Sequence, residues 1–331
     1  MRRRFSFFAR RARFFLPLPA AALLLAACRA HPGWAAALTA HVYAPCWRLL
    51  GRAAAYLPLP ACWALAGGFA LFAALCVFRR RFGRALAAVL TALAVFLGGW
   101  GVSCQKAPLA AQITSERISL EQLCAQLAAA AEENACAAPD ADAIFAAVPA
   151  SLDAAADRLG IPAGGFAAPR ASGLSSLLTR LFTEGIFIPF TGEALVNEAM
   201  PACCLPFVAC HEAAHARGVA REEDANLAAY LACSLSDDAF FRFSGAVCAL
   251  SFALDDLRAA DAAAYARVCG ALSGRTRDAL CARSAFWEPY RGTRAAAAAV
   301  SVNEGYLFSI GAQESGTAAY GEFVERMLGN D

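Results

Sequence analysis

The sequence has little charge and almost no histidine. Charged residues make up 17% of its 331 residues, against about 25% in an ordinary soluble domain. Hydrophobic residues reach 59%, and the mean hydropathy of +0.47 points towards a membrane protein. The formal net charge is only +2, so the overall charge gives no indication of a nucleic-acid partner. Because only four histidines are present, two of them at a regular spacing carry information.

The sequence also lacks any CxxC pair, although it contains 14 cysteines. They are scattered through apolar stretches, and Cys62 and Cys76, for example, lie inside long uncharged runs. Buried free thiols behave as small hydrophobic groups. We therefore expect most cysteines to be packing residues and predict no disulfide framework.

Three apolar segments predict a membrane region over residues 1–111, with spans at 14–28, 53–78 and 85–104. The second and third carry no charge and are long enough to cross about 30 Å of hydrocarbon. The first is short for a span, and its arginine-rich flank and apolar centre are also typical of a signal sequence. Leu25–Cys28 resembles a lipoprotein cleavage box, so a retained span and a cleaved signal both stay open.

Two arginine clusters determine the predicted topology. They lie at the N-terminus and between the second and third segments, and comprise Arg2, Arg3, Arg4, Arg10, Arg11 and Arg13, then Arg79, Arg80, Arg81 and Arg84. Because cytoplasmic flanks of membrane spans are enriched in arginine and lysine, we expect both clusters in the cytoplasm. Residues 112–331 then form an extracytoplasmic domain of a multi-pass protein in a bacterial cell membrane. The 29–52 loop, also placed outside, carries Arg29, Arg48 and Arg52, which weakens the asymmetry.

The segment His211–His215 reads HEAAH and is the most informative motif of the chain. Two histidines four residues apart lie one above the other on a single helix face, where one Zn²⁺ can take both imidazoles. Glu212, between them, would lie beside the metal and could accept a proton from a zinc-bound water. The motif therefore predicts His211 and His215 as zinc ligands and Glu212 as the general base.

The residues around the motif predict where its helix begins and ends. Pro206 suits the first helical turn, and Gly218 is a natural stop because glycine readily takes a positive φ. On an uninterrupted helix Glu222 would lie about 16 Å further along the axis than His211. A turn at Gly218 can bring Glu222 back towards the two histidines. Catalytic zinc needs a third protein ligand, and the candidates are Glu222, Glu223 and Asp224.

Two short strands are predicted before the motif helix. The β-branched and aromatic residues of 185–190 favour an extended chain, and Glu193–Asn197 is a second strand after a turn. Zinc proteases commonly hold their substrate along an edge strand next to the motif helix. Pro189 suits such an edge, and a plain core hairpin is the alternative. Elsewhere we expect a capping box at Ser119, a helix over Pro149–Leu159 and a loop over 160–173.

The run Glu222–Asn226 resembles the ExxA[DN] helix of glutamate-type zinc peptidases. In that helix the first glutamate binds the metal, and the residue four positions later supports a motif histidine through a hydrogen bond. The resemblance therefore implies Glu222 as the third ligand and Asn226 as the residue that orients a histidine.

A longer likeness covers most of the chain. The sequence resembles the bacterial membrane family named "domain of unknown function 3810", whose members are regarded as zinc peptidases. The matching stretches are 189–193, 211–215, Gly218, 222–226, 230–233, 243–245, 302–307 and 320–321, with Pro45, Pro58 and 100–101 in the membrane region. The sequence departs from the family pattern at Asp224, where a glutamate is expected, and over 279–300.

These observations predict a mainly α protein with two to three N-terminal transmembrane helices and a mostly helical zincin-like domain that contains a small β-element. The expected activity is zinc-dependent hydrolysis of a peptide or protein substrate, with membrane lipid as the other partner. No histidine follows His215, so Tyr290 or Tyr306 would have to stabilise the oxyanion. The rival hypothesis is a non-enzymatic membrane protein with a structural or sensory metal site.

Overall fold

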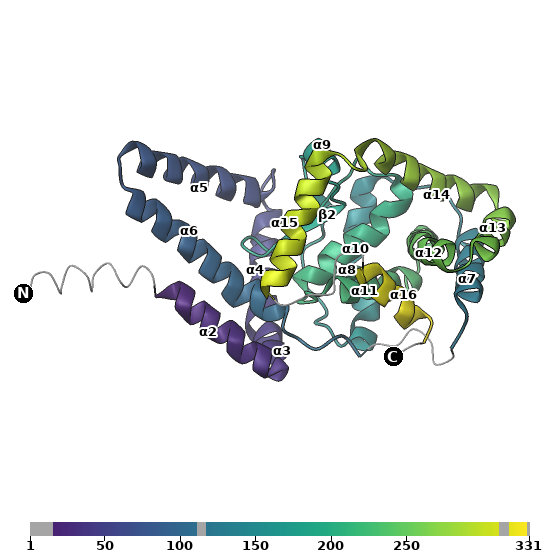
Figure 1. Ribbon diagram of the computed structural model, residues 1–331, viewed down its shortest axis with the longest axis horizontal. Coiled ribbons are helices and arrows are strands. Elements are labelled where there is room, and N and C mark those ends of the chain that lie inside the picture. Colours follow the sequence, from purple (N-terminus) through teal and green to yellow (C-terminus); the bar gives the residue numbers. More distant parts are fainter. Residues whose placement is uncertain (1–15, 111–116, 311–317, 330–331) are drawn as a thin grey trace, which may run out of the picture.

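The computed structural model describes residues 16–110, 117–310 and 318–329. The protein is mainly helical, as predicted, and has two parts (Figure 1). Apolar N-terminal helices project to one side, and a body of helices with one small sheet lies on the other. The N-terminal arginine cluster lies outside the described residues.

The projecting part consists of α2 (Pro17–Ala30), α5 (Ala61–Phe78), α6 (Phe82–Phe96) and its continuation η2 (Leu97–Gly101). α2 packs along α6 and η2, and α5 packs against α6. Between α2 and α5 the chain is helical in α3 (Pro32–Leu38), η1 (Thr39–Tyr43) and α4 (Ala44–Ala55). The connection at 29–52 is therefore largely helical.

The second predicted span begins too early. Residues 53–55 belong to the end of α4, and α5 starts only at Ala61. Uncharged composition alone does not mark this break. The physical reason for it lies in Pro58 and Pro60, because a proline disfavours the helical conformation of the residue before it.

Two helices are long and apolar enough to cross a membrane. They cover Ala61–Phe78 and Phe82–Gly101, and only 11% and 6% of an apolar 18-residue stretch of each is buried inside the protein. Core helices of soluble proteins are mostly buried, so these two do not form a core. α2 is apolar but shorter, with 14 residues.

The body is built around two helices, α10 (Leu205–Ala216) and α11 (Glu222–Ser234), which pack against each other. Both pack against α8 and α12, and α7 lies against α12. The remaining elements are α7 (Leu120–Glu133), α8 (Ala141–Leu159), α9 (Ser175–Arg180), η3 (Ala202–Cys204), α12 (Ala239–Ala260), α13 (Ala262–Ala271), α14 (Gly274–Trp287), η4 (Glu288–Tyr290), α15 (Arg294–Ile310) and α16 (Ala318–Met327). One continuous apolar core joins α7, α8, α10 to α14 and α16.

Local sequence signals explain how α7 and α8 begin. The capping box of Ser119 with Gln122 is confirmed at the start of α7. Asp140 caps α8 by accepting a hydrogen bond from the Ala143 N–H. The helix therefore begins before Pro149, which lies inside it rather than at its start as the sequence predicted.

A three-stranded sheet lies against α10. Its strands are β1 (Arg170–Ala171), β2 (Gly185–Ile188) and β3 (Glu193–Val196), in the order β1-β3-β2. β2 and β3 form the predicted antiparallel hairpin. β1 lies in the segment 160–173, which was predicted to be a loop, and pairs with β3 in parallel. β2 is therefore an edge strand, and both β2 and β3 pack on α10.

The turn between β2 and β3 rests on the projecting helices. A Cβ atom on Gly192 would lie 2.3 Å from the Trp47 carbonyl oxygen of α4. The buried Glu193 carboxylate accepts hydrogen bonds from the first N–H groups of α5, those of Ala61 and Cys62, at 2.8 and 2.9 Å. The Phe190 ring stacks on Phe96 of α6, with 6.2 Å between centroids. The hairpin is thus fixed to the ends of both α5 and α6.

Candidate metal centre

The two motif histidines lie on α10, which is buried along its whole length except at the half-buried His211. Pro206 occupies its first turn, where a missing N–H costs nothing. The helix ends at Ala216, and Gly218 follows with a φ of +89°. A Cβ atom at Gly218 would also lie 2.5 Å from Thr39 Cγ2, so both the backbone conformation and the space require glycine.

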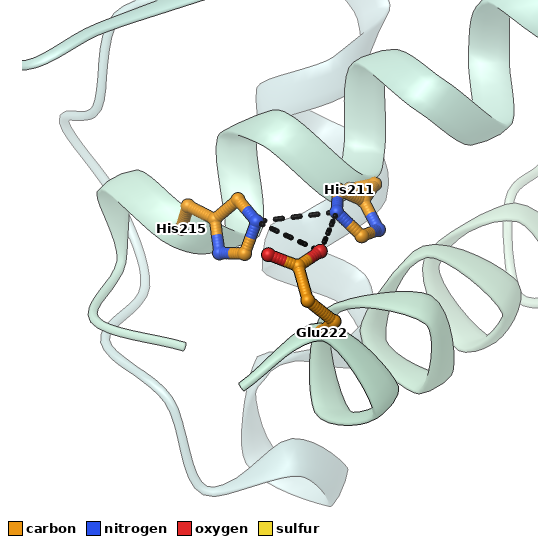
Figure 2. Close-up of side chains that lie close together, drawn as sticks. All are labelled: His211, His215 and Glu222. Carbon is orange, nitrogen blue, oxygen red and sulfur yellow. Dashed lines mark hydrogen bonds and ion pairs between the residues drawn. The ribbon is translucent and has the colours of Figure 1, made fainter. Parts of the chain in front are cut away.

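The turn at Gly218 reverses the chain, and α11 begins at Glu222 beside the histidines (Figure 2). The Nε2 atoms of His211 and His215 lie 3.1 Å apart. Glu222 Oε2 lies 3.1 Å from the first and 3.8 Å from the second. The ligand atoms of all three residues lie within 4.8 Å of one another, which is close enough to hold one metal ion.

Each imidazole uses its second nitrogen to bind the surrounding protein. His211 Nδ1 lies 2.9 Å from Asn226 Oδ1, and His215 Nδ1 lies 2.6 Å from the Val219 carbonyl oxygen. Because both oxygens are acceptors, each Nδ1 carries a hydrogen and donates it. The Nε2 atoms then point into the cluster, where each offers a lone pair to a metal once its ring is neutral.

The remaining acidic candidates for the third ligand are bound elsewhere. Glu223 is buried and accepts a hydrogen bond from Arg221 Nε. Asp224 is also buried, and accepts from Arg326 at 2.6 Å and from the Leu109 N–H at 3.0 Å. Neither residue belongs to the cluster. Of the three acids that the sequence offered, the structure brings only Glu222 to the histidines.

Glu212 lies outside the ligand cluster and faces β2. Its side chain lies against Gly185, where an added Cβ atom would come within 2.6 Å of Glu212 Cγ. The Phe187 backbone gives the carboxylate a hydrogen bond. Burial raises the pKa of Glu212 to about 8, reinforced by the charges of Glu222 and Glu184 and opposed by His211. Glu212 is therefore a buried carboxylate next to the cluster that can take up a proton near neutral pH.

His211 and Glu222 form an ion pair when His211 is protonated. Burial alone would lower the pKa of His211, but the hydrogen bond and charge of Glu222 outweigh it and raise that pKa. Burial would raise the pKa of Glu222, but the His211 hydrogen bond lowers it. Burial lowers the pKa of His215 to about 4, so this ring is neutral at pH 7. The contact between His211 and Glu222 therefore favours the charged form of each.

The projecting helices contribute to the walls of the cluster. The Trp100 ring of η2 lies edge-on to His215, with 5.3 Å between centroids. Phe187 of β2 lies behind it, 5.3 Å from Trp100 and 6.5 Å from His215. Lys106 Nζ donates a 2.9 Å hydrogen bond to the Gly218 carbonyl oxygen. The residues that follow α6 thus support both His215 and the turn that positions Glu222.

The two tyrosines proposed for the oxyanion remain without support from the geometry. Tyr290 ends η4, and among the described residues no hydrogen bond joins it to the cluster. Tyr306 belongs to α15, and its side chain lies outside those that the structure describes.

Sequence reasoning also missed Trp100 and Lys106 as neighbours of the site. The only sequence signal was the likeness of Trp100 and Gly101 to the family's membrane half.

The fold and the cluster define a mostly helical protein with two long apolar helices and a His-His-Glu group that could hold a metal. The family described as "Protein of unknown function (DUF3810)" matches residues 39–328. The match covers most of the chain, so the protein belongs to this family. No curated protein and no solved structure matches the chain.

Proposed function

We propose that the protein is a membrane-bound zinc peptidase with a zincin-like catalytic domain. The observation that supports this best is the convergence of His211 Nε2, His215 Nε2 and a Glu222 carboxylate oxygen within 4.8 Å. Three nitrogen and oxygen ligands with a place left for water are typical of catalytic zinc. The Glu222 side chain is 39% exposed, so the cluster is accessible from one side.

The chemistry of the donor set fits zinc. Both imidazoles direct an Nε2 lone pair into the cluster because their Nδ1 atoms donate outwards to Asn226 and Val219. When bound, zinc would acidify a water and polarise the scissile carbonyl. Glu212 would accept the proton of that water and deliver it to the leaving amine nitrogen.

The edge of β2 that pairs with no other strand of the described residues is the proposed place for the peptide. Asn197 N–H donates to the Glu184 carbonyl oxygen, and Ile186 and Ile188 face Leu195 and Glu193 in the same ladder. In an antiparallel pair, alternate residues direct their backbone groups to the partner strand. Gly185 and Phe187 therefore direct theirs to the unpaired edge, where Glu212 lies and accepts a hydrogen bond from the Phe187 backbone. A substrate strand added at this edge would pass Glu212.

The apolar helices are proposed to anchor the enzyme in a bacterial cell membrane. α5 and α6 would cross it, with the exposed Arg79, Arg80, Arg81 and Arg84 at the cytoplasmic end and the body outside. Figure 1 places the α5–α6 connection far from the body, consistent with a helical hairpin through the bilayer. Membrane lipid would then surround the exposed apolar faces of both helices.

The rival function is a structural or sensory metal site without catalysis. Structural zinc sites are usually closed by four ligands and rich in cysteine. Among the described residues, the group that could hold a metal contains no cysteine, and Glu212 lies next to it without belonging to it. A buried carboxylate in that place has a task in hydrolysis and none in a structural site.

The test compares wild-type protein with the Glu212→Gln variant, both purified as full chains in detergent. Each is given a randomised peptide library, and new termini are identified by mass spectrometry while bound zinc is measured in parallel. We expect the variant to keep its zinc and to cleave about 10²–10⁴-fold more slowly. Glu133→Gln, at an exposed position, is the matched control and should behave as wild type. Equal cleavage by the Glu212 variant would exclude this mechanism.

A further inference from the structure

The β2–β3 hairpin connects the candidate site with the membrane-spanning candidates. At one end, Gly185 contacts Glu212. At the other end, Phe190 stacks on Phe96 of α6, and Glu193 accepts hydrogen bonds from the first N–H groups of α5. The distance between the ends is short: Phe190 lies in the turn, two residues after β2 ends at Ile188, and five residues span at most about 17 Å even when fully extended.

The ring contacts of His215 place the cluster equally close to the apolar helices. His215 packs edge-on against Trp100, at a centroid distance of 5.3 Å. Trp100 belongs to the apolar stretch Phe82–Gly101, one residue before its end. No linker or separate domain therefore lies between the proposed zinc ligands and the end of a proposed membrane span.

The strand that would hold the substrate and the turn that follows it carry exposed apolar residues on the way to α6. Ile186 is 39% exposed and Phe190 is 38% exposed. Monomeric proteins commonly expose single apolar side chains, but these two lie along the proposed peptide path and end at the Phe96 ring. A substrate segment that has just left the hydrocarbon would bring apolar side chains of its own to this path.

We infer that the substrate is a membrane-anchored polypeptide, cut in the segment next to its anchor. The inference rests on the proposed function. A peptide laid on the free edge of β2 would extend from Glu212 to the membrane end of α6, so the cut bond would lie within about five residues of the anchor. In the reaction, the C–N bond breaks, the water oxygen joins the carbonyl carbon, and a proton passes through Glu212 to the amine nitrogen.

The test varies the distance between cleavable sequence and anchor. Synthetic substrates carry the same randomised ten-residue segment either 0 or 25 residues from a twenty-residue apolar helix, joined by a glycine–serine spacer, in both chain directions. A third set has no helix. The full-length protein is reconstituted with each set in phosphatidylethanolamine–phosphatidylglycerol vesicles, and new termini are counted by mass spectrometry. Glu212→Gln vesicles provide the background.

We expect Glu212-dependent cleavage of the adjacent set to be at least tenfold faster than that of the 25-residue set. Both anchored sets are confined to the same membrane. The ratio of their cleavage rates therefore reflects the distance between cleavable segment and anchor, and not the local substrate concentration. Equal cleavage of the two anchored sets, or equal cleavage of the soluble set, would overturn the inference and leave the proposed peptidase intact. Absence of Glu212-dependent cleavage in every set would overturn the proposed function, and this inference with it.

A variant tests the path itself. Phe190→Ser removes the ring that joins β2 to Phe96 and should reduce cleavage of the adjacent set while leaving zinc content unchanged. Leu177→Ser is the matched control, because Leu177 is an exposed apolar residue of α9 and does not belong to the β2–β3 hairpin. A Phe190→Ser protein that retains zinc and the full preference for the adjacent set would count against the path.

Discussion

Glu212 lies against Gly185, in space that any side chain at position 185 would occupy. An added Cβ atom would lie 2.6 Å from Glu212 Cγ and 2.7 Å from Oε1. Both residues are fixed, Glu212 by its helix and Gly185 by the β2–β3 ladder. The orientation of the proposed general base therefore depends on the absence of a side chain in the neighbouring strand.

The Gly185→Ala variant should displace the Glu212 carboxylate while leaving the metal ligands in place. Because small misplacements of a catalytic group are costly, we expect a loss of roughly 10²-fold in peptide cleavage with unchanged zinc content. Gly270→Ala is the matched control, since nothing lies within 4 Å of a Cβ atom there. Wild-type cleavage by Gly185→Ala would show that Glu212 is not the base.

Asn226 should act on the metal through His211. Its Oδ1 atom accepts from His211 Nδ1 at 2.9 Å, which directs Nε2 into the cluster. Loss of such a partner typically weakens metal binding by about 10–100-fold. We expect this loss in Asn226→Ala, measured by competition with a chromophoric chelator, and partial recovery in Asn226→Asp, which keeps an acceptor. Equal zinc affinity in all three proteins would contradict the role.

Local patterns predicted much of the candidate site. The four-residue spacing predicted one helix face for His211 and His215, and Gly218 predicted the end of that helix. The β-branched run before the motif predicted the hairpin. These features depend on neighbours in sequence, so composition and spacing carry them.

The surroundings of the site depend on contacts between distant segments, which a single sequence does not encode in any local pattern. Nothing near Trp100 indicates that its ring meets His215, and nothing near Thr39 indicates that it packs on Gly218. The choice among the three acids after Gly218 was likewise open to local reasoning. Only the chain reversal into α11, or likeness to known peptidases, favours Glu222.

Replacing Gly218 should damage the site for two separable reasons. Alanine at φ +89° is strained, and its Cβ atom would also lie 2.5 Å from Thr39 Cγ2. Gly160 ends α8 at φ +65° with nothing within 4 Å, so Gly160→Ala carries the backbone strain alone. We expect Gly160→Ala to cost about 1 kcal/mol of stability. Gly218→Ala should cost more and also lose zinc, as measured by thermal unfolding and metal analysis. Equal effects of the two would contradict this account.

Zinc binding should release a proton. Zinc takes the neutral imidazole, whereas Glu222 raises the pKa of His211 in the metal-free protein. His215, with its pKa lowered to about 4, is already neutral at pH 7. We therefore expect release of about one proton per zinc at pH 7. Affinity should rise with pH while His211 is protonated, and level off above its pKa. Calorimetric titration in buffers of different ionisation heat measures this number, and zero release would contradict the ion pair.

The arginines between α5 and α6 predict the orientation of the protein in the membrane. Arg79, Arg80, Arg81 and Arg84 are exposed at the end of the helix pair remote from the body. Arginine-rich connections stay in the cytoplasm, so the body and its C-terminus should lie outside. Alkaline phosphatase fused after Asp331 should be active, because that reporter matures only outside the cytoplasm. A fluorescent protein that matures only in the cytoplasm, fused at the same residue, should be dark. The reverse pair of results would invert the topology and place the zinc ligands on the cytoplasmic side.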